Sequence, residues 1–156
     1  MQLLNTSTDA TFSVNTTDSI AKSTVKSVYM SLPEELRNII IDTTTISGHG
    51  KTNTTNFTST DKLYLIDAKE IYGASYREIY NTTAKEYEKQ LDYYLNQKVT
   101  TSSYSAAIKQ YNGSDTYWWL RSALSDYTDH FTIAPFAGGW NTSNFAYGVS
   151  PAFRIG

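Results

Sequence analysis

The sequence predicts an α+β domain, and two observations carry the prediction. Up to about residue 95, apolar residues recur at helical spacing behind residues that suit helix starts, over 18–32, 33–40 and 83–95. After Val99 the helical spacing ends, and short apolar runs between turn signals replace it. Helices followed by short strands are typical of an α+β layout, here two or three helices packed on a small antiparallel sheet.

The predicted helices have recognisable starts. Asp18 suits the cap of the first helix, and Pro33 suits the first turn of the second. The third helix follows a capping-box pattern at 83–86. The residues expected on the buried sides of the second and third helices are Leu36, Ile39, Ile40, Tyr87, Leu91, Tyr94 and Leu95.

Strand and turn signals fill most of the remaining chain. Residues 62–66 form a short apolar run that fits a buried central strand. A capping-box pattern at 67–70 follows it, and Gly73 is placed to stop the resulting turn of helix. The other expected features are a hairpin turn at Asn112-Gly113, a strand at 132–134, a turn at Gly138-Gly139 and closing strands within 147–155.

Two polar stretches are expected to lie outside these elements. Residues 1–17 read as a polar lead, and the Thr-, Asn- and Gly-rich stretch 43–60 reads as a mobile loop. The sequence contains no internal repeat and no interdomain linker. Its 156 residues therefore suit a single domain spanning 1–156.

The motif Tyr-Trp-Trp-Leu-Arg-Ser at 117–122 is expected to be the central strand. Side chains alternate between the faces of a strand, so Trp118 and Leu120 share one face, and Trp119 and Arg121 share the other. Trp118 is expected in the core. Burial of its ring contributes roughly 2–3 kcal/mol.

The closing segment 151–155 repeats this pattern. Phe153 and Ile155 fall on one face, with Arg154 on the other, so this segment is expected to pair with the motif strand. Arg121 and Arg154 have two interpretations. They either pack over Trp119 and neighbouring tyrosines, which we favour, or grip an anionic or sugar ligand.

Composition limits the classes of function. A net charge of −2 with 18% charged residues leaves no basic surface for nucleic acid. Polarity comes instead from Thr, Ser, Asn and Tyr, which suit adaptable binding surfaces, although β-rich proteins are also rich in Thr and Tyr. The absence of cysteine excludes disulfides and thiolate chemistry. The start of the chain does not read as a signal peptide, and no segment is long enough for membrane insertion.

Candidate chemistry is sparse, so we expect no enzymatic activity. Ser122 or Ser125 with His130 and Asp129 would make a Ser–His–Asp set, but no glycine-flanked nucleophile turn accompanies it. Two distant histidines without cysteine do not predict a zinc site. No cofactor is expected. Calcium stays open as an alternative, because Asp126 and Asp129 are hard oxygen ligands, although their spacing matches no calcium loop.

The motif at 117–122, together with Gly-Val-Ser-Pro-Ala-Phe at 148–153, resembles a bacterial and prophage domain family of unknown function. That family is marked by Trp-Trp-Leu-Arg-Ser and by a closing Gly-Val-Arg-Pro-Ala-Phe. Residues 32–36 and 60–65 resemble its middle portion, so the likeness covers about 18–155. Ser150 stands where the family usually has Arg, and Ala123 where Pro is common.

The family is similar in layout to C-type-lectin-like folds, which include the variable proteins of diversity-generating retroelements. The resemblance implies such a fold here, with recognition by the loops that follow the motif strand. The expected framework residues are Trp118, Trp119, Arg121, Phe153 and Arg154. The residues expected to bind the ligand are Asp126, Tyr127, Asp129, His130, Phe131, Trp140, Asn141, Asn144, Phe145 and Tyr147.

The expected function is recognition of a cell-surface protein or glycan, as in receptor binding by a phage. The expected location is a virion tail or a bacterial cell surface, where the chain would act as part of an assembly. One alternative is a structural tip or decoration module of such an assembly. Whether the chain forms a homo-oligomer is left open. The structural-module alternative would predict a homo-oligomer.

Overall fold

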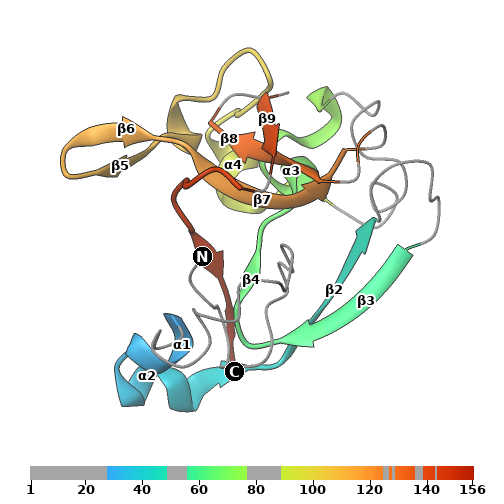
Figure 1. The fold of residues 1–156 in the computed structure, drawn as a ribbon. Helices are drawn as coiled ribbons and strands as arrows, with labels where there is room; N and C mark the ends of the chain where they lie inside the picture. The colour runs from blue at the N-terminus through green and yellow to red at the C-terminus, as the bar shows by residue number, and fades with distance from the viewer. Residues whose placement is uncertain are drawn as a thin grey trace.

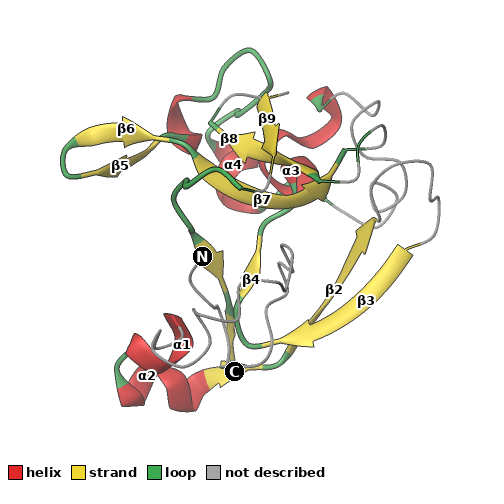
Figure 2. Ribbon diagram, viewed as in Figure 1, coloured by secondary structure: helices red, strands yellow, loops and turns green. Residues whose placement is uncertain are grey.

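The computed structural model describes residues 28–48, 56–76, 89–124, 127, 129–135, 139–142 and 144–156. Over these residues the protein is a mixed α+β structure with short helices and several small antiparallel sheets, which confirms the predicted fold class (Figure 2). No described helix combines the length and apolar character that crossing a membrane requires. The polar lead 1–17 and residues 18–27 of the first predicted helix lie outside the described residues.

The largest sheet is built on the motif strand. Strand β7 (Trp118–Ala123) pairs with β8 (His130–Ala134), which pairs with β9 (Gly139–Thr142), all antiparallel (Figure 1). This confirms the strand predicted at 132–134. Gly139 opens β9, while Gly138 lies outside the described residues. The register between β7 and β8 shifts between Trp119 and Ala123, which is the signature of a β-bulge.

The two faces of β7 belong to two hydrophobic cores, as the alternation of its residues predicts. Trp118 and Leu120 pack in one core, which contains Ile71 and Tyr72. Trp119 packs in the other core. We call the core of Trp118 the first core and the core of Trp119 the second core. The Trp118 indole N–H donates to the Ala107 carbonyl at 3.1 Å, so its polar edge is satisfied despite burial.

Helix α3 (Ala68–Tyr72) lies against β7 and β8 and follows its sequence signals closely. The Asp67 carboxylate accepts from the Lys69 N–H, and the Glu70 carboxylate accepts from the Asp67 N–H, so the predicted capping box is present. Gly73 caps the C-terminal end at a φ of 59°, and a 3-10 turn, η1 (Gly73–Ser75), continues from it. Both predictions for this helix are confirmed.

Helix α4 (Asp92–Asn96) is shorter than predicted. Tyr94 is buried, but Leu91 and Leu95 are exposed, so the predicted apolar stripe is wrong at those two positions. The reason is length: a helix of five residues that begins at Asp92 turns only one side chain into the core. Tyr87 and the capping-box pattern at 83–86 lie outside the described residues. A 3-10 turn, η4 (Ser105–Ala107), leads from this region into the strands.

The predicted Asn112-Gly113 hairpin is confirmed. Strands β5 (Lys109–Tyr111) and β6 (Ser114–Thr116) pair antiparallel on either side of it. Asn112 and Gly113 have φ values of 51° and 77°, as a type I′ turn requires. The hairpin projects away from the rest of the molecule (Figure 1).

The prediction of a mobile loop over 43–60 is wrong at 43–48 and 56–60, while residues 49–55 lie outside the described residues. Strands β2 (Thr43–Gly48) and β3 (Asn56–Asp61) form a long antiparallel hairpin. Thr and Ser are common in loops, but β-branched Thr also suits strands, so composition alone does not distinguish the two here. Thr43, Thr45 and Ser47 alternate into buried positions, so hydroxyl groups occupy the face that apolar residues usually occupy.

The second predicted helix is present as α2 (Glu34–Ile39), which follows the short α1 (Val28–Ser31). Its predicted buried side is only partly confirmed. Leu36 packs against the second core, but Ile39 is exposed, and Ile40 is buried as a residue of strand β1 (Ile40–Ile41) instead. The helix ends one residue before the chain becomes extended, which turns Ile39 outward.

The closing segment pairs elsewhere than predicted. Strand β10 (Pro151–Ala152) pairs with β4 (Tyr64–Leu65), the buried strand expected within 62–66, and β11 (Arg154–Ile155) pairs with β1. The motif strand cannot take this partner because its second edge is occupied. Trp119 N–H donates to the Gly148 carbonyl at 3.0 Å, and Arg121 N–H donates to the Ile66 carbonyl at 3.1 Å.

The side chains of the closing segment also depart from the prediction. Phe153 and Ile155 are exposed rather than packed behind the motif strand, so the framework role expected of Phe153 is wrong. Short two-residue pairings, with β4 and then β1, hold this segment as it runs from the middle of the molecule to the C-terminus, at the end opposite the β7–β8–β9 sheet (Figure 1).

Candidate functional site

The arginine of the motif is part of a buried charge network. The side chain of Arg121 is 7% exposed, and its guanidinium lies 3.5 Å from the Asp67 carboxylate and 3.3 Å from the Glu70 carboxylate. Both acids come from the capping box of α3. The anionic partners of Arg121 are thus groups of the protein itself, which supports the structural interpretation of this residue over ligand binding.

Ser122 completes the same network. Its hydroxyl donates to Asp67 Oδ2 at 2.6 Å and accepts from the Ala68 N–H at 2.8 Å, and the side chain is fully buried. The hydroxyl is therefore committed to the start of α3. Ser125, the other serine considered for a Ser–His–Asp set, lies outside the described residues.

The contacts of Arg121 and Arg154 differ from the expected packing over Trp119. The ring beside Trp119 belongs to Tyr147, with centroids 5.1 Å apart, and the cation over Trp118 is Lys109 at 5.0 Å. Arg154 is exposed and hydrogen-bonds Tyr64. Burial and the Glu70 carboxylate raise the pKa of Tyr64, and the charge and hydrogen bond of Arg154 act against that rise.

Three of the predicted binding residues form one aromatic cluster. The Tyr127 ring stacks on Trp140 with centroids 5.4 Å apart, and His130 lies 4.3 Å from Tyr127 and 4.9 Å from Trp140. Tyr127 is 42% exposed and Trp140 is 40% exposed. We call these three residues the aromatic cluster. It joins a residue after β7 to residues of β8 and β9 that are close only because those strands pair.

Asp129 fixes the orientation of the histidine in this cluster. Its Oδ1 lies 2.7 Å from His130 Nδ1, and its side chain is 58% exposed. A carboxylate at Nδ1 favours a proton on that nitrogen and leaves Nε2 to face other partners. Asp126, the other acid predicted in this region, lies outside the described residues.

The remaining predicted binding residues lie on the opposite face of the sheet. In antiparallel pairs, residues directly opposite share a face, so Phe131 and Asn141 share one face while His130 and Thr142 share the other. Phe131 packs against the second core together with Tyr147. The expectation of one continuous surface is therefore wrong, because the period-two alternation of β8 and β9 divides it.

On this opposite face, Tyr147 is the centre of a second group of aromatic side chains. Asn141 donates its side-chain N–H to the Tyr147 hydroxyl at 2.7 Å, and Phe145 stacks on the Tyr147 ring at 5.9 Å. Tyr117, which the sequence analysis did not select, lies 5.5 Å from the same ring and is half-exposed. Its place beside the double tryptophan, on the face of Trp119, was the available signal.

Asn144, two residues after the end of β9, is the exception among these residues. It is exposed and accepts a hydrogen bond from the Thr142 hydroxyl, which lies opposite His130 in the register. The face of the aromatic cluster thus carries a polar border contributed by Asp129, which precedes β8, by Thr142 at the end of β9, and by Asn144 after it.

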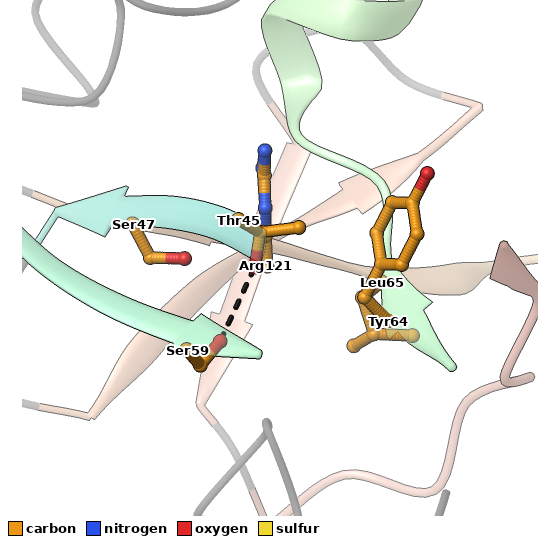
Figure 3. Close-up of a pocket in the computed structure, with 6 residues that line it drawn as sticks. All are labelled: Thr45, Ser47, Ser59, Tyr64, Leu65 and Arg121. Atoms are coloured by element: carbon orange, nitrogen blue, oxygen red, sulfur yellow. Dashed lines mark hydrogen bonds between the residues drawn. The ribbon is translucent and has the colours of Figure 1, made fainter. Parts of the chain in front are cut away.

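A small pocket lies between the β2–β3 hairpin and the motif strand. Thr45, Ser47 and Ser59 line it from the hairpin, and Thr45 and Ser59 share a hydrogen bond of 3.2 Å (Figure 3). The other lining residues are Tyr64, Leu65 and Arg121. Its cavity volume is about 10 Å³, which is room for about one water molecule. Ligand pockets usually hold roughly 300–1,000 Å³, so the aromatic cluster is the stronger candidate site.

The described residues contain no group of three or more His, Asp or Glu side chains that could hold a metal ion. Asp126, one of the two acids on which the calcium alternative depends, lies outside those residues.

Comparison with known proteins places the chain in one family. No curated protein and no solved structure matches it. A sequence family described as a domain of unknown function (DUF6273) matches residues 4–156. This match spans nearly the whole chain, and the chain therefore belongs to the DUF6273 family.

Proposed function

We propose that this protein is a non-enzymatic recognition domain with a C-type-lectin-like fold, which binds a cell-surface protein or glycan. The binding surface is the aromatic cluster with Asp129 and Asn144 beside it. The buried network of Arg121, Asp67 and Ser122 fixes the motif strand, and the strand in turn fixes the neighbouring β8 and β9. Rigid scaffolds that display adaptable residues are typical of recognition domains.

One observation carries this proposal. Tyr127 and Trp140 are about two-fifths exposed even though each ring already contacts His130 and the other ring. Exposed aromatic side chains that are held in place lose little conformational freedom on binding, which makes them effective anchors. The same rings would be expected in the core if their only role were to stabilise the fold.

The proposed setting is a phage tail or a bacterial surface assembly, with the segment after β7 diversified as in retroelement variable proteins. This setting rests on the likeness of the motifs. A reverse transcriptase gene and a near-copy of the coding segment for residues 117–150 beside the gene would support diversification. Tail genes alone would support a phage receptor-binding protein without it.

The first test replaces both exposed rings of the cluster. Tyr127→Ala with Trp140→Ala is expected to abolish binding of the purified chain to a panel of labelled bacterial cells. The melting temperature should fall by about 5–10 °C while the variant keeps the parent's circular dichroism spectrum at 25 °C, because about three-fifths of each ring is buried.

The matched control for that test is Tyr111→Ala. Tyr111 is a 71% exposed aromatic residue on the β5–β6 hairpin, away from the cluster. It is expected to leave cell binding unchanged. Equal binding by the double variant and the parent would remove the recognition assignment.

The projecting β5–β6 hairpin favours a second candidate, a structural module whose tip contacts a neighbouring subunit. A two-stranded hairpin with an exposed Tyr111 is a simple docking element. This function predicts a homo-oligomer in solution that Tyr111→Ala dissociates and that the cluster variant does not. Light scattering during size-exclusion chromatography distinguishes the two candidates.

A further inference from the structure

We propose that the ligand unit on the aromatic cluster is a neutral hexopyranose ring of a glycan. The ring lies with its C–H face against Trp140 and Tyr127 and directs its hydroxyls to Asp129 and Asn144. This inference rests on the proposed recognition function and names its ligand class.

The spacing of the rings decides how a ligand is held. Centroid separations of 4.3, 4.9 and 5.4 Å are those of rings already in contact. No group as large as a methylated ammonium fits between them, so the cluster is not an aromatic cage of the kind that encloses such cations. A ligand meets the outer, exposed parts of Tyr127 and Trp140, and a flat apolar face is the shape that suits them.

The polar groups beside the rings match sugar hydroxyls. Asp129 uses Oδ1 for His130, and its carboxylate has further acceptor capacity in a side chain that is largely exposed. Asn144 uses its side-chain oxygen to accept from Thr142, which leaves its amide N–H groups as donors. An acceptor and a donor on the border of an aromatic surface suit neighbouring hydroxyls of one sugar ring.

Charge excludes acidic ligands. Between Arg121 and Arg154 the sequence contains no Lys or Arg, whereas it contains Asp126 and Asp129. The segment that carries the cluster is therefore free of positive side-chain charge apart from a protonated histidine. Binding of a uronic acid, a sialic acid or a phosphate-bearing glycan would bring an anion toward the Asp129 carboxylate without a counter-charge from this segment.

Size argues against a protein partner. A stable protein interface buries about 800 Å² on each side around an apolar centre. On this face the described residues offer two half-exposed rings bordered by Asp129, Thr142 and Asn144, which suits a single sugar ring.

The test titrates the full chain with methyl glycosides of glucose, galactose, mannose and N-acetylglucosamine, and with glucuronic and N-acetylneuraminic acids. The readout is the indole N–H signal of Trp140 in NMR spectra. Trp118 and Trp119 are 1% and 4% exposed and serve as internal references. At least one neutral glycoside is expected to shift the Trp140 signal saturably. The acids should bind about tenfold more weakly or not at all.

Variants connect the shift to the proposed contacts. Asp129→Asn, followed by the Trp140 signal, and Trp140→Phe, followed by isothermal titration calorimetry because it lacks that indole, should each weaken binding of that glycoside about tenfold. Tyr111→Ala should leave it unchanged. An affinity of Asp129→Asn equal to the parent's would contradict the assigned role of the carboxylate.

Cell binding separates this inference from the function on which it rests. If binding depends on Trp140 but survives periodate oxidation of surface glycans and is lost after protease treatment, the ligand is a protein. The glycan assignment then fails while recognition stands. If binding does not depend on Trp140 at all, both fail. Competition by a lysine-rich peptide, without competition by neutral glycosides, would also overturn the glycan assignment.

Discussion

At the scale of single residues, Arg121 shows how burial decides a role that sequence leaves open. The motif placed an arginine beside two tryptophans, which suggested either stacking or a grip on a ligand. The folded chain brings Asp67 and Glu70 within 3.5 Å of its guanidinium, across more than fifty residues of sequence. Removing one partner from a buried ion pair is costly, because the remaining charges lose their compensation in a poorly solvated site.

Arg121→Leu should therefore destabilise the protein by about 3–5 kcal/mol, because Asp67 and Glu70 would stay buried without their cation. Arg154→Leu is the matched control, since Arg154 is exposed, and it should cost at most about 1 kcal/mol. Urea unfolding followed by circular dichroism measures both. Similar losses for the two variants would contradict the buried network as the basis of the motif.

His130 combines one contact with its neighbour in sequence and two contacts that the fold creates. Asp129 precedes it, and the two side chains do meet, at 2.7 Å. The rings of Tyr127 and Trp140 both contact the imidazole and also contact each other, at a place that only the pairing of β8 with β9 creates.

At the scale of elements, local signals worked where the backbone itself sets the preference. The capping box of α3, its Gly73 stop and the Asn112-Gly113 turn are all present, because each depends on residues within one turn of chain. The β2–β3 hairpin was missed because its Thr- and Ser-rich sequence has equal local support as loop or strand. The burial of its hydroxyl face depends on packing against the motif strand, which local sequence does not show.

The Asn112-Gly113 turn gives a test at this scale. Gly113 has a φ of 77°, and a methyl group added there would meet nothing within 4 Å, so any cost of Gly113→Ala is conformational. The variant should destabilise the hairpin by about 1 kcal/mol.

The effect of Gly113→Ala should be local. Hydrogen exchange at the amides of β5 and β6 is expected to quicken about fivefold, with little change in the melting temperature of the whole protein. Asn112→Gly is the control, because it keeps a residue suited to positive φ at the other turn position. Unchanged exchange in Gly113→Ala would contradict a type I′ turn.

At the scale of the whole molecule, two cores meet at the motif strand, and tyrosine contributes to both stability and pH response. Tyr72 is buried in the first core, and its hydroxyl donates to the Pro135 carbonyl at 2.8 Å. Burial raises the pKa of Tyr72 well above its ordinary value of 10.0, with smaller contributions from Tyr94 and Tyr104. Burial also raises the pKa of Tyr94.

These shifts predict alkaline destabilisation. Above pH 10 the unfolded chain releases the Tyr72 proton while the folded chain keeps it, so stability present below pH 10 declines as pH rises toward the folded pKa. Tyr72→Phe should be about 1 kcal/mol less stable near pH 8, because the Pro135 carbonyl loses its donor. It should then lose less stability than the parent between pH 10 and 11.

Urea midpoints measured from pH 8 to pH 11 test this expectation. Tyr111→Phe is the control, because Tyr111 is largely exposed, and its curve should run parallel to that of the parent. A Tyr72→Phe curve parallel to the parent across pH 10 would contradict the link between burial of this phenol and the alkaline response.

The candidate site was predictable in part. Sequence reasoning named Tyr127, His130 and Trp140, and the structure brings these three together. It also placed Phe131, Asn141 and Tyr147 on the same surface, whereas these lie on the other face of the sheet. The composition of the segment indicated its chemistry, but the assignment of each side chain to a face needed the register of β8 and β9.

The sequence by itself determined the α+β class, the helix caps, the hairpin turn, and the two-faced alternation of Trp118 and Trp119. All of these follow from the stereochemistry of neighbouring residues. Only the tertiary structure decided that the closing segment pairs with β4 and β1, that Arg121 joins Asp67 and Glu70, and that one polar segment forms two surfaces. The physical reason is distance along the chain: pairings between remote segments depend on which strand edges and charges remain to be satisfied once the cores have formed.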